Sequence, residues 1–410
     1  MKLLMLGLNY APEPVGIGPY TAGLAEALAA RGHRVAVIAG KPYYPQWRLY
    51  DGHENGRAET VERGVAVTRV PHVIPADPSG GKRILHHLSF AASSYAPTMR
   101  AARAKPDLVF AVAPSLLSIA IAARAARAAD APLWAHVQDF EIEAAFATGL
   151  LDPASVVGRA ARWGEGRILA LADVVSSIGP QMCDRLVAKG IARERVFELR
   201  NWSDPGFDFA RADARTYRRE WRLGERHVAL YSGNIANKQG LEIVIAAARI
   251  LAARDDIAFV ICGEGPNRAR LEQLAGGLPN VQFHGLQSAA RMADLLSLAT
   301  VHLLPQIVGA ADLVLPSKLT NMLASARPVA ATAAAGTGLA AEVDGCGLVT
   351  EPGDPQALAD AVARLVDEPA LREALGAEAG RRAAARWSRD SVIDGFERRA
   401  AELVRRRAPR

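Results

Sequence analysis

Short apolar runs alternate with helix-like patterns along the whole chain. In the first half, KLLMLGLN, HRVAVIAG, DLVFAVAP, PLWAHVQD and DVVSSIG are the apolar runs. The series restarts with HVALYSGN, IAFVICGEG, NVQFHG, ATVHLLPQ, RPVAATA and GLVTEPGD. Almost every central position in these runs is apolar, as expected for strands that are buried on both faces of a parallel sheet. The pattern therefore predicts an α/β protein with two doubly wound, Rossmann-like domains.

Turn-forming residues and the last helical pattern set the expected domain limits. They cluster at LRNWSDPGFD, which places the join near residue 200 and gives domains of 1–200 and 201–387. The chain ends in SRDSVIDGFERRAAELVRRRAPR, which predicts a helix over about 388–410 that returns to the first domain. Pairing with the helix dipole accounts for the arginines at its end.

Composition favours a globular cytoplasmic enzyme. The chain has 410 residues, of which 50% are hydrophobic, and its three cysteines (Cys183, Cys262 and Cys346) are far apart. Such spacing indicates reduced thiols, with neither a disulfide framework nor a zinc site. The N-terminal apolar run meets prolines too early for a signal peptide. The stretch 108–123 is broken by Pro114, so it predicts a strand and a helix instead of a membrane span.

Positive charge is concentrated in the first half. Residues 1–200 contain 23 Lys and Arg against 18 Asp and Glu, and the whole chain has a net charge of +6. Within 79–129 the single acid is Asp107, and the basic residues are Lys82, Arg83, Arg100, Arg103, Lys105, Arg124 and Arg127. Two interpretations stay open, a solvated helix face and a surface that binds an anionic membrane or a phosphate-bearing partner. No nucleic-acid partner is expected.

Two glycine turns, VGIGPY (15–20) and GEGPNR (263–268), each lead from an apolar run into a helical pattern. Gly16 and Gly18 in the first turn, and Gly263 and Gly265 in the second, could present backbone N–H groups to a phosphate. Such turns also serve packing, so the motif alone is weak. An NAD site would need an acid after the next strand. Lys41 and His284 stand there, so a nucleoside diphosphate sugar fits better.

Several longer stretches resemble glycosyltransferase family 4, a group of retaining enzymes with the GT-B fold. They are VGIGPYTAGLAEALAARGHRV, ELRNWSD, YSGNIANKQGLEIVIAAARIL, VICGEGPNRARLEQL, VQFHGLQ and LPSKLTNMLASARPVAATA. The similarity runs from residue 1 to about 390 and is strongest to the colanic-acid and O-antigen branch. It implies that two domains face each other across a cleft, the first for the acceptor and the second for the nucleotide sugar.

The resemblance also implies how the diphosphate is held. No Asp-x-Asp occurs in the chain, so neither a metal nor another cofactor is expected. Positive side chains would stabilise the leaving group instead. In GNIANKQG (233–240), Lys238 is the principal candidate, beside Gly233 and Asn234, which replaces the usual family arginine. Lys318 in PSKLTN is a second candidate, although a solvated lysine would also explain it.

The family's two donor-binding glutamates are absent from their usual positions. Asn321 stands where the ribose-binding carboxylate is expected, and an amide could still hydrogen-bond the ribose hydroxyls. Asp312 is the nearest carboxylate to the other position, one residue out of register, and Ser317 precedes the candidate Lys318. With Gly16, Gly18, Gly233, Asn234, Gly263, Gly265 and His284, these residues form the expected donor site.

The stretch PLWAHVQDFEIEAAF (132–146) resembles the family strand that ends in a His-Asp pair near the transferred sugar. Gln138 occupies the histidine position and Asp139 the aspartate, and His136 lies on the same face as Gln138. A buried structural role also explains His136. Asp139, Glu141 and Glu143 would share one side of an extended chain, where Asp139 or Glu141 would contact the acceptor or the sugar. A metal site made of them is disfavoured.

These observations predict a retaining, metal-independent hexosyltransferase of exopolysaccharide or O-antigen synthesis. The candidate donor is GDP-fucose, and the acceptor is a polyprenyl-diphosphate-linked sugar at the inner face of the cytoplasmic membrane. KPYYPQWRLYDGH (41–53) and the basic segment 83–103 would form the aromatic and basic surface that attaches the protein peripherally. Two alternatives remain, a nucleotide-sugar epimerase and a non-catalytic subunit that binds a nucleotide sugar or glycan.

Overall fold

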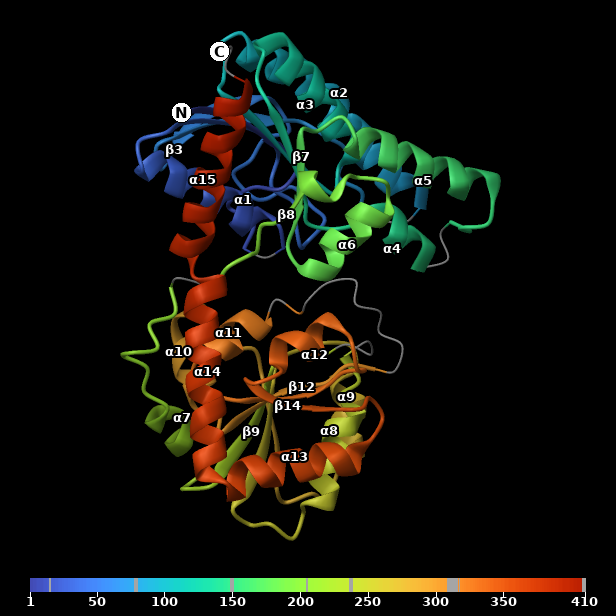
Figure 1. Cartoon of the computed structure of the whole chain (residues 1–410). Coiled ribbons are helices and arrows are strands. Elements are labelled where there is room, and N and C mark those ends of the chain that lie inside the picture. Colours follow the sequence, from blue (N-terminus) through green and yellow to red (C-terminus); the bar gives the residue numbers. More distant parts are fainter. Residues whose placement is uncertain are drawn as a thin grey trace. The chain divides into compact units, whose positions relative to one another are not determined.

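Two compact units make up the computed structural model of the chain (Figure 1). The structure describes residues 1–14, 16–76, 80–147, 151–203, 206–235, 239–307, 316 and 318–407. One unit comprises Met1–Arg200 with Val392–Arg410, and the other comprises Asn201–Ser391. Each contains its own parallel sheet covered by helices, so the predicted pair of doubly wound α/β domains is confirmed.

The first unit is built on an eight-stranded sheet with the order β3-β4-β2-β1-β5-β6-β7-β8. All neighbouring strands are parallel except β3 and β4. The strands are β1 (Lys2–Gly7), β2 (Arg34–Gly40), β3 (Ala58–Glu62), β4 (Val65–Val70), β5 (Leu108–Ala113), β6 (Leu133–Val137), β7 (Val174–Ser177) and β8 (Val196–Glu198). The helices are α1 (Gly18–Ala30), α2 (Gly80–Ala102), α3 (Leu116–Ala129), α4 (Glu141–Ala147), α5 (Val156–Leu169), α6 (Pro180–Ala188) and α15 (Arg389–Arg407).

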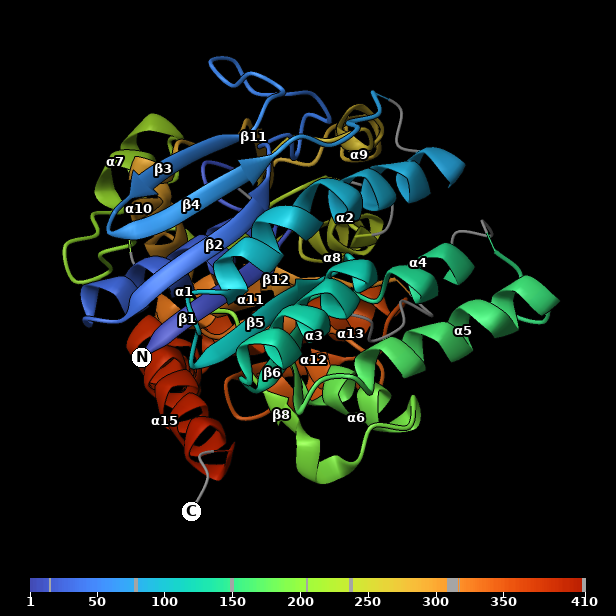
Figure 2. The ribbon, with the colours of Figure 1, turned by 90° about the horizontal axis from the view of Figure 1, so that it is seen from above.

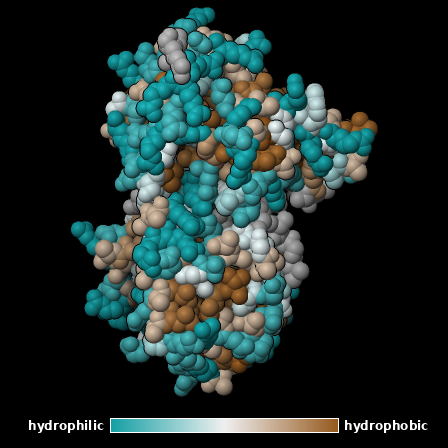
Figure 3. Space-filling view, viewed as in Figure 1, coloured by the Kyte–Doolittle hydropathy of each residue, from teal (hydrophilic) through white to brown (hydrophobic). Residues whose placement is uncertain are grey.

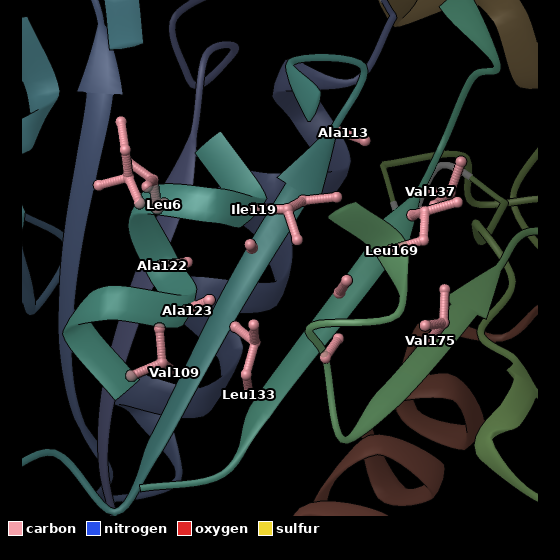
Figure 4. Packing of buried hydrophobic residues seen from close by; sticks show 14 of the residues in the cluster. Leu6, Val109, Ala113, Ile119, Ala122, Ala123, Leu133, Val137, Leu169 and Val175 are labelled. Carbon is pink, nitrogen blue, oxygen red and sulfur yellow. The ribbon is translucent and has the colours of Figure 1, made fainter. Parts of the chain in front are cut away.

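Alanine-rich helices cover one face of this sheet. Ile119, Ala122 and Ala123 of α3 pack against Leu6 and Val109 of the central strands, and all five are buried (Figure 4). The small alanine side chains let the α3 backbone approach the sheet closely, as the high packing density of protein interiors requires. The stretch 108–123 thus forms a strand followed by the start of a helix, as predicted.

The opposite face carries α1 and the C-terminal helix α15 (Figure 2). Phe396 of α15 is fully buried, and its ring stacks on Trp134 of β6 with the centroids 4.8 Å apart. It also meets the ring of Phe110 of β5 edge-on at 5.3 Å. Arg31 at the end of α1 forms ion pairs with Asp394 and Glu397 of α15. Aromatic burial and these surface ion pairs hold the last helix in the first unit.

The second unit contains a six-stranded parallel sheet with the order β11-β10-β9-β12-β13-β14. Its strands are β9 (His227–Ser232), β10 (Ile257–Cys262), β11 (Val281–His284), β12 (Val301–Leu304), β13 (Val329–Thr332) and β14 (Gly347–Thr350). Its helices are α7 (Arg215–Glu220), α8 (Glu242–Ile250), α9 (Arg268–Leu274), α10 (Met292–Ser297), α11 (Lys318–Ala324), α12 (Gly338–Val343), α13 (Pro355–Asp367) and α14 (Pro369–Trp387). Buried side chains line both faces of the sheet, as the apolar runs indicated.

The hairpin β3–β4 and the short strand β8 were not expected from the apolar runs. β3 has the sequence AETVE and is largely exposed, since it lies at the edge of the sheet. Arg63 and Gly64 form the turn of the hairpin with φ values of 47° and 83°. Positive φ at both central positions suits the tight turns that match the twist of a β-hairpin. An edge strand of this kind lacks the continuous apolar pattern that revealed the central strands.

Candidate functional site

Lys318 lies beside the first glycine turn of the second unit. Its ammonium donates a hydrogen bond to the Tyr231 hydroxyl at 2.9 Å, and that hydroxyl donates to the backbone oxygen of Asn234 at 2.6 Å. A Cβ atom on Gly233 would lie 3.4 Å from the ammonium, so the turn and Lys318 are in contact. Tyr231 ends the buried part of β9 and thereby fixes the lysine at the carboxyl edge of the sheet.

The second glycine turn packs directly against the first. A Cβ on Gly263 would lie 1.9 Å from the backbone oxygen of Gly233, and one on Gly265 would lie 2.3 Å from that of Ile235. Both glycines also have positive φ, 151° and 159°. Close backbone approach therefore accounts for these two residues. The arrangement joins Gly233, Asn234, Gly263, Gly265 and Lys318 in one place, and the sequence alone did not reveal this packing.

Arg268 ties the ends of β10 and β11 together next to these turns. Its guanidinium donates to the backbone oxygens of Gly263 at 2.8 Å and His284 at 3.1 Å, and to the Glu264 carboxylate at 2.8 Å. The His284 ring stacks on Trp221 with a centroid distance of 3.8 Å. Burial, followed by the charge of Arg268, lowers the pKa of His284. The imidazole is therefore neutral at pH 7 and adds no positive charge to the site.

Asn321 follows Lys318 by three residues in α11, so the two lie on neighbouring parts of the helix surface. Asn321 is half-buried. The other candidates of this site, Lys238, Asp312 and Ser317, lie outside the described residues. Their assignments remain predictions from the sequence.

A buried carboxylate, Glu13, stands at the first glycine turn of the N-terminal unit. It is 3% exposed, accepts from the Asn9 amide at 2.9 Å, and accepts from the backbone N–H groups of Tyr43 and Tyr44 at 3.0 and 3.1 Å. A Cβ on Gly18 would lie 3.1 Å from its Oε2 atom. Burial raises the pKa of Glu13.

The same turn is tightly packed on its other side. Gly16 has a φ of 75°, and a Cβ there would lie 3.1 Å from the Tyr44 ring. A carboxylate and an aromatic ring thus occupy the surroundings of Gly16 and Gly18. These groups make the first turn a poorer phosphate site than its sequence suggested, because a carboxylate repels a phosphate.

The three candidates at the end of β6, His136, Gln138 and Asp139, have different surroundings. His136 is 4% exposed, its Nδ1 lies 2.9 Å from the Ser176 hydroxyl, and its ring stacks on Phe110. Burial lowers the pKa of His136 to about 3. These are the surroundings of a structural histidine. Gln138 is also buried, whereas Asp139 reaches the surface at the carboxyl edge of the sheet, although partial burial of its carboxyl group raises its pKa. Asp139 is therefore the group of the three that a substrate could reach.

Glu141 and Glu143 do not continue an extended chain from Asp139. They lie in the first turn of helix α4, so the expected row of three carboxylates on an extended chain is corrected. Glu141 pairs with His87 at 2.5 Å, and Glu143 pairs with Arg185 at 2.8 Å and with Lys189 at 2.8 Å. The two glutamates thus fix α4 to α2 and α6. Across the described ranges, no cluster of three or more His, Cys, Asp or Glu side chains suits a metal ion.

The aromatic segment 41–53 faces inward more than the sequence suggested. Tyr43 is 4% exposed and packs against Trp47, His72 and His86, while the Tyr50 hydroxyl donates to the backbone of Tyr44. Tyr43 is therefore removed from the expected aromatic surface, whereas Tyr44, Trp47 and Tyr50 are half-buried. Within the part of the chain that the structure covers, no helix is long and apolar enough to cross a bilayer.

Comparisons with known proteins agree with this architecture. Residues 15–202 match the Glycosyl transferase 4-like domain, and residues 226–368 match the Glycosyl transferases group 1 family. The colanic acid biosynthesis glycosyl transferase WcaI of Escherichia coli (strain K12) is 42% identical over 347 residues, which cover 83% of this chain and 85% of that protein.

Solved structures share the fold at low sequence identity. Sucrose-phosphate synthase from Thermosynechococcus elongatus superposes with a TM-score of 0.72 at 18% identity, covering 99% of this chain and 100% of that one. Anabaena HepE in complex with UDP gives a TM-score of 0.67 at 16% identity, covering 98% and 100%. The chain therefore belongs to glycosyltransferase family 4, has the GT-B fold, and is a glycosyltransferase of the colanic-acid branch.

Proposed function

We propose that this glycosyltransferase moves a hexose, with retention of configuration, from a nucleoside diphosphate sugar to a polyprenyl-diphosphate-linked exopolysaccharide intermediate. The 42% identity to a colanic acid biosynthesis glycosyl transferase carries the pathway and the reaction class. The structure of HepE with UDP-glucose supports a nucleotide sugar as donor, since that protein has the same fold. GDP-fucose is the donor that we propose first, by resemblance to the colanic-acid branch.

Lys318 supports this function through the chemistry of the leaving group. Negative charge grows on the diphosphate as the bond to the sugar breaks, and a fixed positive charge stabilises that state. The ammonium is held at the first glycine turn by the Tyr231 hydroxyl and needs little rearrangement. Together with Lys238, it would perform the role that a metal ion performs in enzymes with Asp-x-Asp. The reaction that we propose is therefore metal-independent.

The acceptor's lipid would bring the enzyme to the inner face of the cytoplasmic membrane. Helix α2 exposes Ile84, Leu85 and Leu88 at 62%, 52% and 48%, next to the exposed Lys82. Helix α5 adds a second group with Val156, Val157 and Trp163, which are 73%, 64% and 70% exposed, and apolar side chains are visible where α5 begins (Figure 3). Exposed apolar residues beside arginines and lysines are typical of surfaces that bind anionic membranes. We call these residues of α2 and α5 the apolar–basic face.

Donor turnover tests the proposed function. The purified chain is first screened by thermal shift against GDP, UDP and dTDP, and the nucleotide that stabilises it identifies the donor class. Release of that nucleotide from its sugar is then measured with and without a lipid-linked acceptor, and the anomeric configuration of the product is read by NMR. We expect acceptor-dependent release and retention. Stabilisation by none of the three nucleotides, with no release from any of their sugars, would reject the proposal.

A further inference from the structure

Two cationic side chains meet at the carboxyl edge of the first sheet, on the face that α1 covers. Ala39 of β2 and Arg69 of β4 are register partners in the parallel sheet. Lys41 comes directly after β2, which ends at Gly40, and it is close enough to Arg69 for the two charges to interact. Lys41 is 3% exposed and Arg69 is 4% exposed.

The guanidinium of Arg69 is hydrogen-bonded through its Nη2 atom but not through its Nη1 atom. Its Nη2 atom donates to the backbone oxygen of Ala11 at 2.6 Å and to the Glu62 carboxylate at 2.8 Å. Its Nη1 atom is buried and makes no hydrogen bond, and the same holds for the nearby Tyr10 hydroxyl, whose ring lies 5.6 Å from the guanidinium carbon. Buried donors without acceptors are rare in folded proteins because each one costs free energy.

Lys41 forms neither a hydrogen bond nor an ion pair with any residue in the described ranges. Burial, followed by the positive charge of Arg69, lowers the pKa of Lys41. Burial, followed by the charges of Arg69 and Lys41, lowers the pKa of the neighbouring His53. Unlike the Arg69 Nη1 atom, the Lys41 ammonium still reaches solvent. Most of the Lys41 side chain is buried, and its ammonium stands beside a second cation, so an accompanying anion would be favourable.

The nearby carboxylates do not provide that anion. Glu62 is bound to Arg69, and Glu13 accepts hydrogen bonds from the Asn9 side chain and from two backbone N–H groups. Glu54 acts on Lys41 only through space and is exposed. Among the described residues, the Lys41 ammonium therefore has no carboxylate partner of its own, and it lies near the Arg69 guanidinium.

We propose that Lys41 and Arg69 form a binding site for a phosphate group of the acceptor substrate. The Lys41 ammonium would contact a phosphate oxygen, and the guanidinium behind it would add a second positive charge. The proposal rests on the proposed function in one respect, because it takes the phosphate to be that of a lipid-linked acceptor. A phosphate from another source, such as free pyrophosphate, would be bound by the same chemistry.

Binding of inorganic pyrophosphate tests the site itself. Thermal unfolding of the full chain is followed with increasing pyrophosphate, at ionic strength matched with NaCl, while the nucleoside diphosphate from the screen fills the donor site. We expect a rise in Tm for the wild type and its loss in Lys41→Met. The Tm of this variant without pyrophosphate should be equal or higher, because an unpaired charge beside a second cation is gone. Lys2→Met is the matched control. Lys2 is exposed and is the first residue of β1, so it lies at the amino-terminal end of the strands, away from Lys41.

Several outcomes would decide this experiment. Retention of the pyrophosphate effect in Lys41→Met would overturn the site. Loss of it in the Lys2→Met control as well would also overturn it, because the effect would then come from general charge. Retention in Lys41→Arg, which keeps the charge, would support it. If no nucleotide stabilises the chain and none is released from its sugar, the proposed function fails, and the pyrophosphate titration without nucleotide still tests Lys41.

Kinetics with two acceptors tests the source of the phosphate. Both carry the same terminal sugar, one on a polyprenyl diphosphate and the other as a neutral alkyl glycoside in the same detergent. We expect Lys41→Met to raise KM about tenfold or more for the diphosphate acceptor and to leave that of the glycoside within about twofold, as loss of one charge-assisted contact implies. Equal changes for both acceptors would overturn the assignment to the acceptor. Loss of pyrophosphate binding with no change in either KM would assign the site to a free anion instead.

Discussion

The Lys318 ammonium donates to the Tyr231 hydroxyl across 87 residues of sequence, at 2.9 Å. Through that contact a half-buried lysine lies against Gly233 in the turn that follows β9. Tyr231 is fully buried, so its hydroxyl is a fixed partner. The same hydroxyl donates a hydrogen bond to the backbone oxygen of Asn234. The pair gives the proposed diphosphate site a cation whose position is set before the donor binds.

Lys318→Met should therefore lower kcat by about a hundredfold, because stabilisation of the leaving group is lost. Donor affinity should fall less, since the charge on the diphosphate grows toward the transition state. Tyr231→Phe keeps the lysine and removes the hydroxyl that holds it, so a smaller decrease in kcat is expected. Steady-state kinetics and calorimetry with the nucleotide measure both effects. Unchanged kcat in Lys318→Met would remove this lysine from the mechanism.

Lys238 is the second cation of the proposed mechanism, and its assignment rests on the sequence GNIANKQG. Lys238→Ala should lower turnover by about a hundredfold or more, with a smaller effect on donor binding. Lys189 is no suitable comparison because it is buried in an ion-pair network, so the exposed Lys105 serves as the control in Lys105→Ala. Near-normal turnover of Lys238→Ala would reject the assignment.

Metal independence is a separate prediction from the absence of Asp-x-Asp in the sequence. Preincubation with EDTA, followed by assay in its presence, should leave turnover unchanged, and added Mg²⁺ or Mn²⁺ should not raise it. Strict dependence on a divalent cation would mean that the lysines do not carry the leaving-group charge by themselves.

The sequence predicted those parts of the fold that depend on local patterns. Continuous apolar runs such as LVFAVA and IAFVIC revealed the central strands, since strands buried on both faces must be apolar throughout. The edge strand β3 escaped notice because its AETVE sequence contacts a neighbour on one side only. Helix α4 escaped notice because alternating acids also fit an extended chain, and only their partners on α2 and α6 distinguish the two.

The candidate site was predictable as a set of residue types but not as a set of contacts. Glu13 bonds to backbone groups 30 and 31 residues away, so nothing next to it in the sequence indicates its role. Arg268 lies in a quoted glycine motif, yet its binding to the ends of two strands appears only when the sheet is assembled. The family pattern drew attention to His136, whereas its burial against Phe110 could not be inferred from that pattern.

Asn321 gives a prediction for nucleotide binding. If its amide bonds the ribose, Asn321→Leu should weaken both the donor and the free nucleoside diphosphate by roughly 1–3 kcal/mol, because a ribose hydroxyl loses its partner. Asn321→Glu restores the carboxylate that the family usually has and should bind at least as tightly. Calorimetry with the nucleotide measures both variants. Equal affinity of wild type and Asn321→Leu would leave Asn321 as a residue of α11 without a role in the donor site.

Buried histidines predict how stability depends on pH. Burial lowers the pKa of His136 to about 3, whereas in the unfolded chain it lies near its ordinary value of about 6.5. The unfolded state therefore binds a proton below about pH 6.5 that the folded state does not, and stability falls as the pH falls toward 3. Between pH 7.5 and pH 5 this group alone should remove ~2 kcal/mol.

His136→Phe separates this contribution from the rest. The ring can still stack on Phe110, and the Ser176 hydroxyl keeps its bond from Trp134 Nε1 at 2.8 Å. Urea unfolding of the two proteins at pH 7.5 and pH 5, followed by tryptophan fluorescence, measures the difference. We expect a smaller loss of stability at pH 5 in the variant. An identical loss in both proteins would show that His136 does not remain neutral in the folded state.

The apolar–basic face predicts a peripheral attachment that depends on charge. Attachment would come from the exposed side chains of α2 and α5. Lysines and arginines attract anionic headgroups, and this attraction weakens as salt screens it. The protein should therefore float with vesicles that contain anionic lipid at low salt, and much less with neutral vesicles or at high salt.

Two sets of substitutions separate the charged and apolar contributions. Reversal of Lys82, Arg100 and Arg103 to glutamate should abolish the preference for anionic vesicles, because these exposed basic side chains lie on α2 and directly after it. Trp163→Ser removes a large ring that is 70% exposed and should weaken flotation on anionic vesicles at every salt concentration.

Nucleotide binding should stay unchanged in both sets of variants, since the substitutions lie in the first unit. Arg193→Glu, in the same unit but outside α2 and α5, is the charge control. Equal flotation of wild type on neutral and anionic vesicles, with full activity on a soluble acceptor, would contradict the membrane assignment while leaving the transferase reaction intact.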